Sequence, residues 1–288
     1  MAGEGQVVLG PGDVLFFLHI PKTGGVTLTR ILDERFSPEE VLPTPDPNNP
    51  AAKFRELPPS RLAKIRLVRG HYWFGPGDGA IHDFLSPDPV TITVIRDPVD
   101  RVVSTFRHAL RDRRNWLSKY LDEDDDLETF LAHPVVENHV RDLQARLVVG
   151  LAPGNRPPAP AGAAKDPESM SAEELLERAK SRLDGFAFVG VTSRLDESVA
   201  SLMRTFGWPP PDDVPKLNAA PRSVASQEIS ERARHRIEEL NQVDAAVYEH
   251  ANRLLDARLP QLAAESGAAA DGTGSSPPPS VVAREAAA

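Results

Sequence analysis

Continuous apolar runs alternate with longer amphipathic stretches along most of the chain. The runs are short and rich in β-branched or aromatic residues, and they predict strands over 14–19, 65–68, 90–95 and 186–191. Because apolar and polar residues do not alternate within these runs, we expect both faces of each strand to be buried. This is typical of a parallel sheet that is covered by helices on both sides.

Helical periodicity and capping residues predict helices between these strands. The expected helices cover 26–35, 99–117, 171–183, 196–207 and 226–259, the last as one helix or two. Ser171 begins a capping-box pattern, and Asp196 is the expected cap of the helix that follows it. Alternating strands and helices predict an α/β fold, with three α/β/α layers around a central parallel sheet.

The amphipathic pattern fades at both ends of the chain and in one internal segment. Residues 1–12 are expected to form a flexible N-terminal arm, 13–260 a single domain, and 261–288 a disordered tail of Ala, Gly, Ser and Pro. The tail has too little apolar surface to offset the entropy of ordering it. A proline-rich insertion at 152–167 is expected to be a surface loop, or a segment that covers an active site.

Composition excludes several classes of protein. The 288 residues include 33 Lys and Arg against 42 Asp and Glu, and the net charge of −9 argues against a nucleic-acid binder. The absence of cysteine excludes disulfides, thiol nucleophiles and cysteine-based metal sites. No signal peptide and no membrane span are predicted, so we expect a cytoplasmic location. The usage of Ala, Arg and Pro indicates a bacterial protein.

A glycine-rich loop follows the first predicted strand and leads into a helix. It comprises Pro21, Lys22, Thr23, Gly24, Gly25, Val26, Thr27 and Leu28. The glycines allow close approach of a ligand, and the helix N-terminus, the Lys22 charge and the two threonine hydroxyls favour a phosphate or sulfate group. The loop is not a Walker A motif, because Lys22 precedes the glycines. The alternative is a simple turn with one surface lysine.

A second basic motif follows the strand predicted at 90–95. Arg96 stands at the carboxyl end of that strand, and Ser104 lies eight residues further along the next helix. Together they are suited to bind one anion through charge-assisted hydrogen bonds. An exposed helix with surface ion pairs is the alternative, which we favour for Arg111, Arg113 and Arg114.

The two motifs together resemble the PAPS-dependent sulfotransferases, where PAPS is 3′-phosphoadenosine 5′-phosphosulfate. The carbohydrate branch, of the heparan sulfate 2-O type with its bacterial relatives, is the most similar. The resemblance covers roughly residues 13–258 and implies a P-loop-like sulfotransferase fold. It implies that residues 21–28 bind the 5′-phosphosulfate and that Arg96 and Ser104 bind the 3′-phosphate. Asn218 and Arg222 are expected in a loop that closes over the nucleotide.

The acceptor hydroxyl needs a general base. The Gly70-His71 dipeptide resembles the Gly-His dipeptide whose histidine is the general base in the uronyl 2-O-sulfotransferases. Those enzymes have a second histidine two positions earlier, where this chain has Arg69. His71 is therefore the expected base and Lys22 the second catalytic residue. The rivals for the base are His82, His139 and Glu137. His19 is expected to be a packed residue that supports the loop.

Several alternatives stay open at this point. Gln144 and Arg146 resemble a family segment near the acceptor, although helix packing explains them equally well. The resemblance implies PAPS as donor, PAP as product, no required metal, and a glycan or small-molecule acceptor. A P-loop-like nucleotide kinase and a non-catalytic PAP- or nucleotide-binding module are the rival functions.

Overall fold

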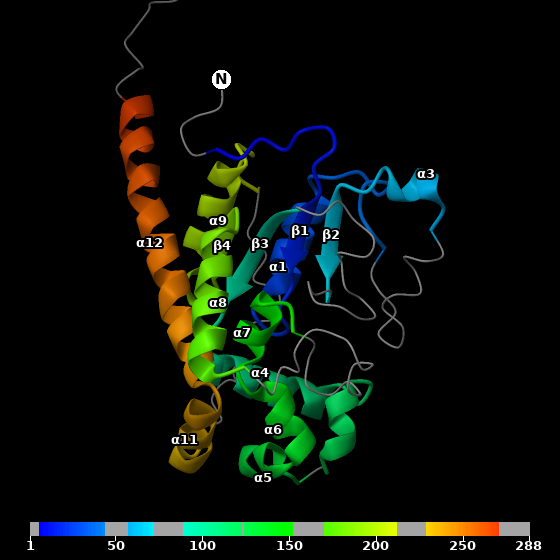
Figure 1. Ribbon diagram of the computed structural model, residues 1–288, viewed down its shortest axis with the longest axis vertical. Coiled ribbons are helices and arrows are strands. Elements are labelled where there is room, and N and C mark those ends of the chain that lie inside the picture. Colours follow the sequence, from blue (N-terminus) through cyan, green and yellow to red (C-terminus); the bar gives the residue numbers. More distant parts are fainter. Residues whose placement is uncertain are drawn as a thin grey trace, which may run out of the picture.

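Four parallel strands form the centre of the protein (Figure 1). The computed structural model describes residues 6–43, 57–71, 89–122, 124–151, 170–211 and 229–270, with side chains described up to 259. The strands are β1 (Leu15–Leu18), β2 (Leu67–Gly70), β3 (Val90–Ile95) and β4 (Phe188–Val191). All four predicted strands are confirmed, and β2 begins slightly later than expected.

The order of the strands creates a reversal in the middle of the sheet. They lie in the order β2-β1-β3-β4, so the chain passes from β1 outward to β2 and from β3 outward to β4. β1 and β3 are direct neighbours, with Leu18 paired to Thr93. Ligands of open α/β sheets bind at such a switch point, outside the carboxyl ends of the strands.

The described helices have the following bounds. They are α1 (Gly25–Asp33), α3 (Pro59–Leu62), α4 (Pro98–Arg111), the 3₁₀ helix η1 (Trp116–Tyr120), α5 (Leu127–Ala132), α6 (Pro134–Val140), α7 (Leu143–Val148), α8 (Ala172–Asp184), the 3₁₀ helix η3 (Thr192–Arg194), α9 (Leu195–Thr205), α11 (Glu231–Leu240) and α12 (Gln242–Ala270). No described helix is long and apolar enough to cross a membrane.

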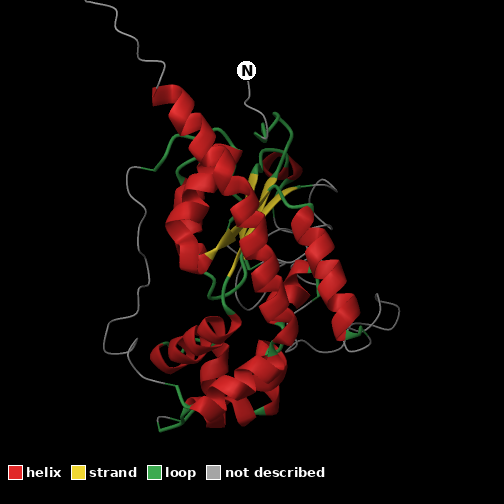
Figure 2. Cartoon of the chain, turned by 90° about the vertical axis from the view of Figure 1, so that its left-hand side faces the viewer, coloured by secondary structure: helices red, strands yellow, loops and turns green. Residues whose placement is uncertain are grey.

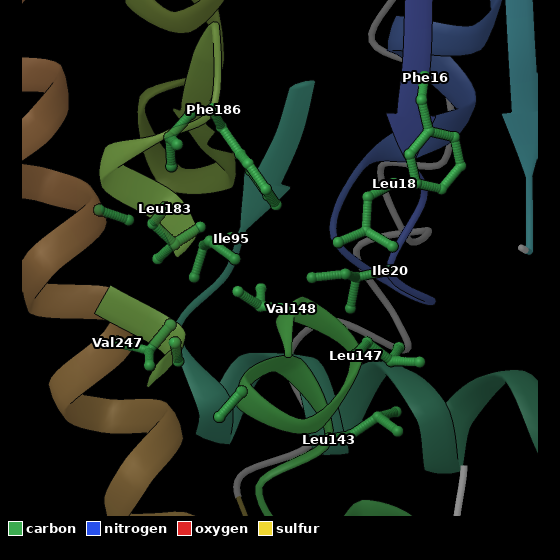
Figure 3. Packing of buried hydrophobic residues seen from close by; sticks show 14 of the residues in the cluster. Phe16, Leu18, Ile20, Ile95, Leu143, Leu147, Val148, Leu183, Phe186 and Val247 are labelled. Carbon is green, nitrogen blue, oxygen red and sulfur yellow. The ribbon is translucent and has the colours of Figure 1, made fainter. Parts of the chain in front are cut away.

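Side chains of β1 alternate between two layers of helices. Phe16 and Leu18 pack against α7, α8 and α12, whereas Leu15 and Phe17 pack against α1 and α9. Figure 2 shows the strands between helices on both sides. The predicted three-layer arrangement is therefore confirmed. Figure 3 shows the first of these clusters at the carboxyl edge of the sheet, where Val148 of α7 lies near Ile20 and Ile95.

A separate group of helices lies at the end toward which the strands point (Figure 1). α4, η1, α5, α6 and α11 share their own apolar cluster, with Phe106, Phe130 and Ile237 among its buried residues. Residues 127–148 were not among the expected helices, although helix packing was one explanation for Gln144 and Arg146. α5, α6 and α7 are each only six or seven residues long, too short to display clear periodicity.

Several predicted helix ends differ from the structure. Ser171 caps α8 as expected, because its hydroxyl accepts from the Glu174 amide at 3.1 Å. Asp196 lies in the first turn of α9 and is not its cap, since η3 leads directly into that helix. α4 ends at Arg111, where the extended backbone of Asp112 separates it from η1.

The two termini of the domain also differ from expectation. The described part of the predicted flexible arm packs on the domain: the Val7 amide donates to the Thr205 carbonyl at 2.7 Å, and Val7 and Leu9 contact the α1–α9 layer. At the other end, α12 continues to Ala270, into the segment expected to be disordered. The alanines there are strong helix formers. The rest of the tail and the insertion at 152–167 lie outside the described residues.

Candidate active site

The loop between β1 and α1 is held in a tight conformation by hydrogen bonds. Lys22 and Gly24 have positive φ angles of 71° and 84°, and such an angle is uncommon for a residue other than glycine. The Thr23 hydroxyl donates to the Ile20 carbonyl at 2.9 Å, and the Thr192 hydroxyl donates to the Thr23 carbonyl at 2.7 Å. The Thr23 hydroxyl, expected to face an anion, is therefore used inside the loop.

The ring of His19 packs directly on the backbone of the second loop glycine. A Cβ atom at Gly25 would lie 2.1 Å from the His19 ring, a distance that real Cβ contacts do not show. The His19 ring also stacks with the ring of Phe17, and the two ring centroids are 5.3 Å apart. Burial, followed by the charges of His71 and Lys22, lowers the pKa of His19 to about 3, so the ring is neutral. His19 thus supports the loop, as expected.

The start of α1 follows this loop directly and has no side-chain cap. Gly24 occupies the N-cap position, and no side chain caps the helix. Leu28, Ile31 and Leu32 are buried and anchor the helix to the sheet, while Val26 is 47% exposed. Thr27 is buried, so its hydroxyl does not face solvent. A helix start without a side-chain cap, at the positive end of the helix dipole, is suited to bind an anion.

Arg96 connects the two strand ends at the switch point. It follows β3 directly, and its Nη1 donates to the Lys22 carbonyl at 3.0 Å. The side chain of Gln144 bonds both backbone groups of Arg96: the Arg96 amide donates to Oε1, and Nε2 donates to the Arg96 carbonyl, both at 2.9 Å. Burial, and then the charges of Arg111 and Arg96, lower the pKa of Lys22. The loop therefore lies in a cationic environment.

Two residues of α4, His108 and Arg111, lie close enough to Lys22 for their charges to interact with it. Ser104, His108 and Arg111 are spaced as neighbours on a helix surface and are less buried than Val102, Val103 and Thr105. Burial and then the Lys22 charge lower the pKa of His108. Arg111, predicted to be a surface ion-pair residue, is thus part of the charge around Lys22, whereas Arg114 does pair with Asp112 at 2.9 Å. The i, i+4, i+7 spacing of Ser104, His108 and Arg111 places them on one face of α4, and this spacing could have identified Arg111 from the sequence.

His71 lies beside the loop, at the end of the neighbouring strand. β1 and β2 pair with Leu18 opposite Gly70, so His19 and His71 are the first residues after two adjacent strands and lie side by side. Their rings stack with centroids 4.6 Å apart, and Nδ1 of His71 lies 3.2 Å from the His19 carbonyl. Because a carbonyl only accepts, Nδ1 carries the proton and Nε2 keeps its lone pair.

His71 is exposed, and its surroundings lower the pKa of its ring, which favours the neutral form. Desolvation by the surrounding protein is the largest effect and lowers the pKa of His71. The hydrogen bond to the His19 carbonyl raises this pKa, and the Lys22 charge lowers it. A neutral imidazole with an unprotonated Nε2 is the form that accepts a proton from a hydroxyl.

The rival bases lie elsewhere or outside the described residues. His139 is buried against Trp116 in the group of helices around α4, and burial lowers its pKa to about 3. Glu137 is bound in ion pairs with Arg141 and Arg236. His82 lies outside the described residues.

The comparison with known proteins decides the family of this chain. The pattern of the sulfotransferase family matches residues 6–251. The chain belongs to the sulfotransferase family. It is similar to heparan-sulfate 6-O-sulfotransferase 1 of Cricetulus griseus and of Mus musculus, with 27% identity over 289 residues in each case. The similarity spans 85% of this chain and 68% and 66% of these two relatives.

Membership of the sulfotransferase family favours sulfuryl transfer over a nucleotide kinase. Neither relative is of the 2-O type to which the Gly70-His71 step was likened, so that branch is not confirmed. Asn218 and Arg222, expected over the nucleotide, lie outside the described residues. Within the described ranges, no group of three or more His, Asp or Glu side chains is arranged to hold a metal ion.

Proposed function

We propose that this protein transfers the sulfuryl group of PAPS to a hydroxyl of a carbohydrate. The observation that carries the proposal is the junction at the switch point, where Arg96 bonds the Lys22 loop and His71 lies at the adjacent strand end. The similarity to two proteins named heparan-sulfate 6-O-sulfotransferase 1 supports a sugar acceptor over a small alcohol or phenol.

The residues present suit the two anionic ends of PAPS. The uncapped start of α1 and Lys22 form a cradle for the 5′-phosphosulfate, and the absence of a Cβ at Gly25 lets the His19 ring support this cradle from within the protein. Arg96 keeps further N–H donors beyond the one that reaches Lys22, and we assign these with Ser104 to the 3′-phosphate. When bound, PAPS supplies a sulfuryl group on a phosphate leaving group.

The roles of the side chains follow from their positions. Nε2 of His71 takes the proton of the acceptor hydroxyl, while the His19 carbonyl holds Nδ1–H and stabilises the ring as it becomes charged. The Lys22 ammonium stabilises the negative charge that develops on the leaving phosphate. Sulfuryl transfer resembles phosphoryl transfer, in which positioning and charge stabilisation dominate.

A calorimetric titration tests the nucleotide assignment. We expect PAP to bind without added metal and more tightly than either ADP or ATP with Mg²⁺. Arg96→Ala is expected to weaken PAP binding by about tenfold or more, because a charge-assisted contact to the 3′-phosphate is lost. Preference for ATP with Mg²⁺ would favour the kinase, and PAP binding without turnover on any acceptor would favour the non-catalytic module.

A further inference from the structure

The side chain of Gln144 acts on Arg96 as a neighbouring strand would. β3 ends at Ile95, and the next residue finds its backbone partners in a side-chain amide. The Arg96 amide donates to Oε1 of Gln144, and Nε2 of Gln144 donates to the Arg96 carbonyl, both at 2.9 Å. Gln144 is fully buried, so water does not replace these bonds when they are lost.

Gln144 is itself held by the C-terminal helix. Its backbone amide donates to Oδ2 of Asp244 at 3.1 Å, and the Ala145 amide donates to Oδ1 at 2.8 Å. Asp244 is fully buried and lies 3.8 Å from Nε of Arg101, which is also fully buried. A carboxylate from α12 therefore caps α7 at the residue that bonds Arg96.

The capping is reciprocal. Oδ1 of Asp142, just before α7, accepts from the Val243 and Asp244 amides at the start of α12, both at 3.0 Å. Leu147 and Val148 of α7 then pack into the cluster below the sheet (Figure 3). Two helix ends and an apolar contact thus fix the position of Gln144.

We propose that Gln144 is a positioning residue that sets the placement of the Arg96 guanidinium for the 3′-phosphate of the nucleotide. This inference rests on the proposed function. Gln144 bonds the backbone of Arg96 on both sides of its Cα atom, so it controls the direction in which the side chain leaves the strand end. The guanidinium donates one hydrogen bond to the Lys22 carbonyl. The direction of the Arg96 side chain therefore sets the position of the N–H donors that remain for the 3′-phosphate.

The test compares PAP with AMP, which lacks the 3′-phosphate. We expect Gln144→Met, which keeps the length of the side chain and removes both hydrogen bonds, to raise the Kd of PAP about tenfold. The Kd of AMP is expected to change less than about twofold, since the loss concerns the 3′-phosphate. The PAP-to-AMP preference, measured by calorimetry, is a readout that a merely structural role does not move.

Leu147→Ala is the matched control. Leu147 lies on the same short helix, is 5% exposed and belongs to the apolar cluster, and its apolar side chain cannot hydrogen-bond the Arg96 backbone. We expect it to lower the melting temperature while leaving the PAP-to-AMP preference unchanged. If Gln144→Met does not fold, Gln144→Leu, which also removes both hydrogen bonds and adds no charge, is measured in the same way, with the same loss of preference expected.

The outcomes separate the inference from the function on which it rests. A fall in PAP-to-AMP preference in the Gln144 variant alone supports the inference. An unchanged preference in a folded Gln144 variant overturns it and leaves the proposed function intact. A wild-type protein that binds PAP and AMP equally overturns the proposed function, and the inference with it.

Discussion

At Gly25 the loop backbone and the His19 ring are in direct contact. A methyl group at this position overlaps an aromatic ring that itself stacks with the rings of Phe17 and His71. We expect Gly25→Ala to lower the free energy of unfolding by about 1–3 kcal/mol, as overpacking does, and to weaken PAP binding by about tenfold or more. Chemical denaturation and calorimetry measure the two effects.

Gly185→Ala is the control for the Gly25 variant. A Cβ at Gly185 meets only ordinary contacts, the nearest being the Arg182 carbonyl at 3.5 Å, so neither quantity is expected to change much. In a His19→Ala background the Gly25 substitution should cost less stability, because the ring that it meets is gone. An equal cost with and without the ring would contradict this explanation.

At the scale of elements, the junction of α7 and α12 brings two carboxylates together. Burial, and next the charge of Asp244, raise the pKa of Asp142 from 3.8 to about 6. The folded protein therefore binds a proton on Asp142 more tightly than the unfolded chain. This contribution to stability is complete below about pH 4 and is lost as the pH rises to about 6.

Asp142→Asn tests this linkage. Asparagine keeps the acceptor for the Val243 and Asp244 amides and tolerates the left-handed backbone at φ 41°. We expect the variant to gain stability relative to wild type as the pH rises from 4 to 6, by roughly 1–3 kcal/mol at pH 7. Urea denaturation across this range measures the difference. A difference that stays constant with pH would show that Asp142 titrates normally.

Some elements could be predicted from the sequence because their signals are local. The strand runs at 14–19 and 90–95 are continuous and apolar, and Ser171 supplies a local cap. α5, α6 and α7 could not be predicted, since each is short and is stabilised by packing more than by its own pattern. The end of α12 at Ala270 was not predicted, because an alanine-rich segment is compatible both with a helix and with a disordered low-complexity tail.

At the scale of the whole molecule, the site arises from the order of the strands. The glycine loop and Arg96 could be predicted from residues that follow buried strands, and the structure brings them into contact at the switch point. The role of Gln144 could not, because it depends on a partner 48 residues away along the chain. The shared face of Ser104, His108 and Arg111 follows from their spacing in the sequence, but which face of α4 lies near Lys22 depends on how the helix packs.

Sulfuryl transfer with His71 as the base is tested most directly by one assay. PAPS labelled with radioactive sulfur is incubated with a heparan-type oligosaccharide and either wild-type protein or His71→Ala. His235→Ala, which changes an exposed histidine on α11, is the control.

We expect wild type and the His235 variant to transfer the label at equal rates. His71→Ala should reduce kcat by about 10²–10⁴-fold while the Kd of PAP changes less than about twofold, since a general base is lost and the nucleotide site is not. Transfer at the wild-type rate by His71→Ala would contradict the assignment of the base. A wild-type protein that transfers no label to any sugar and phosphorylates a substrate from ATP would contradict the account as a whole.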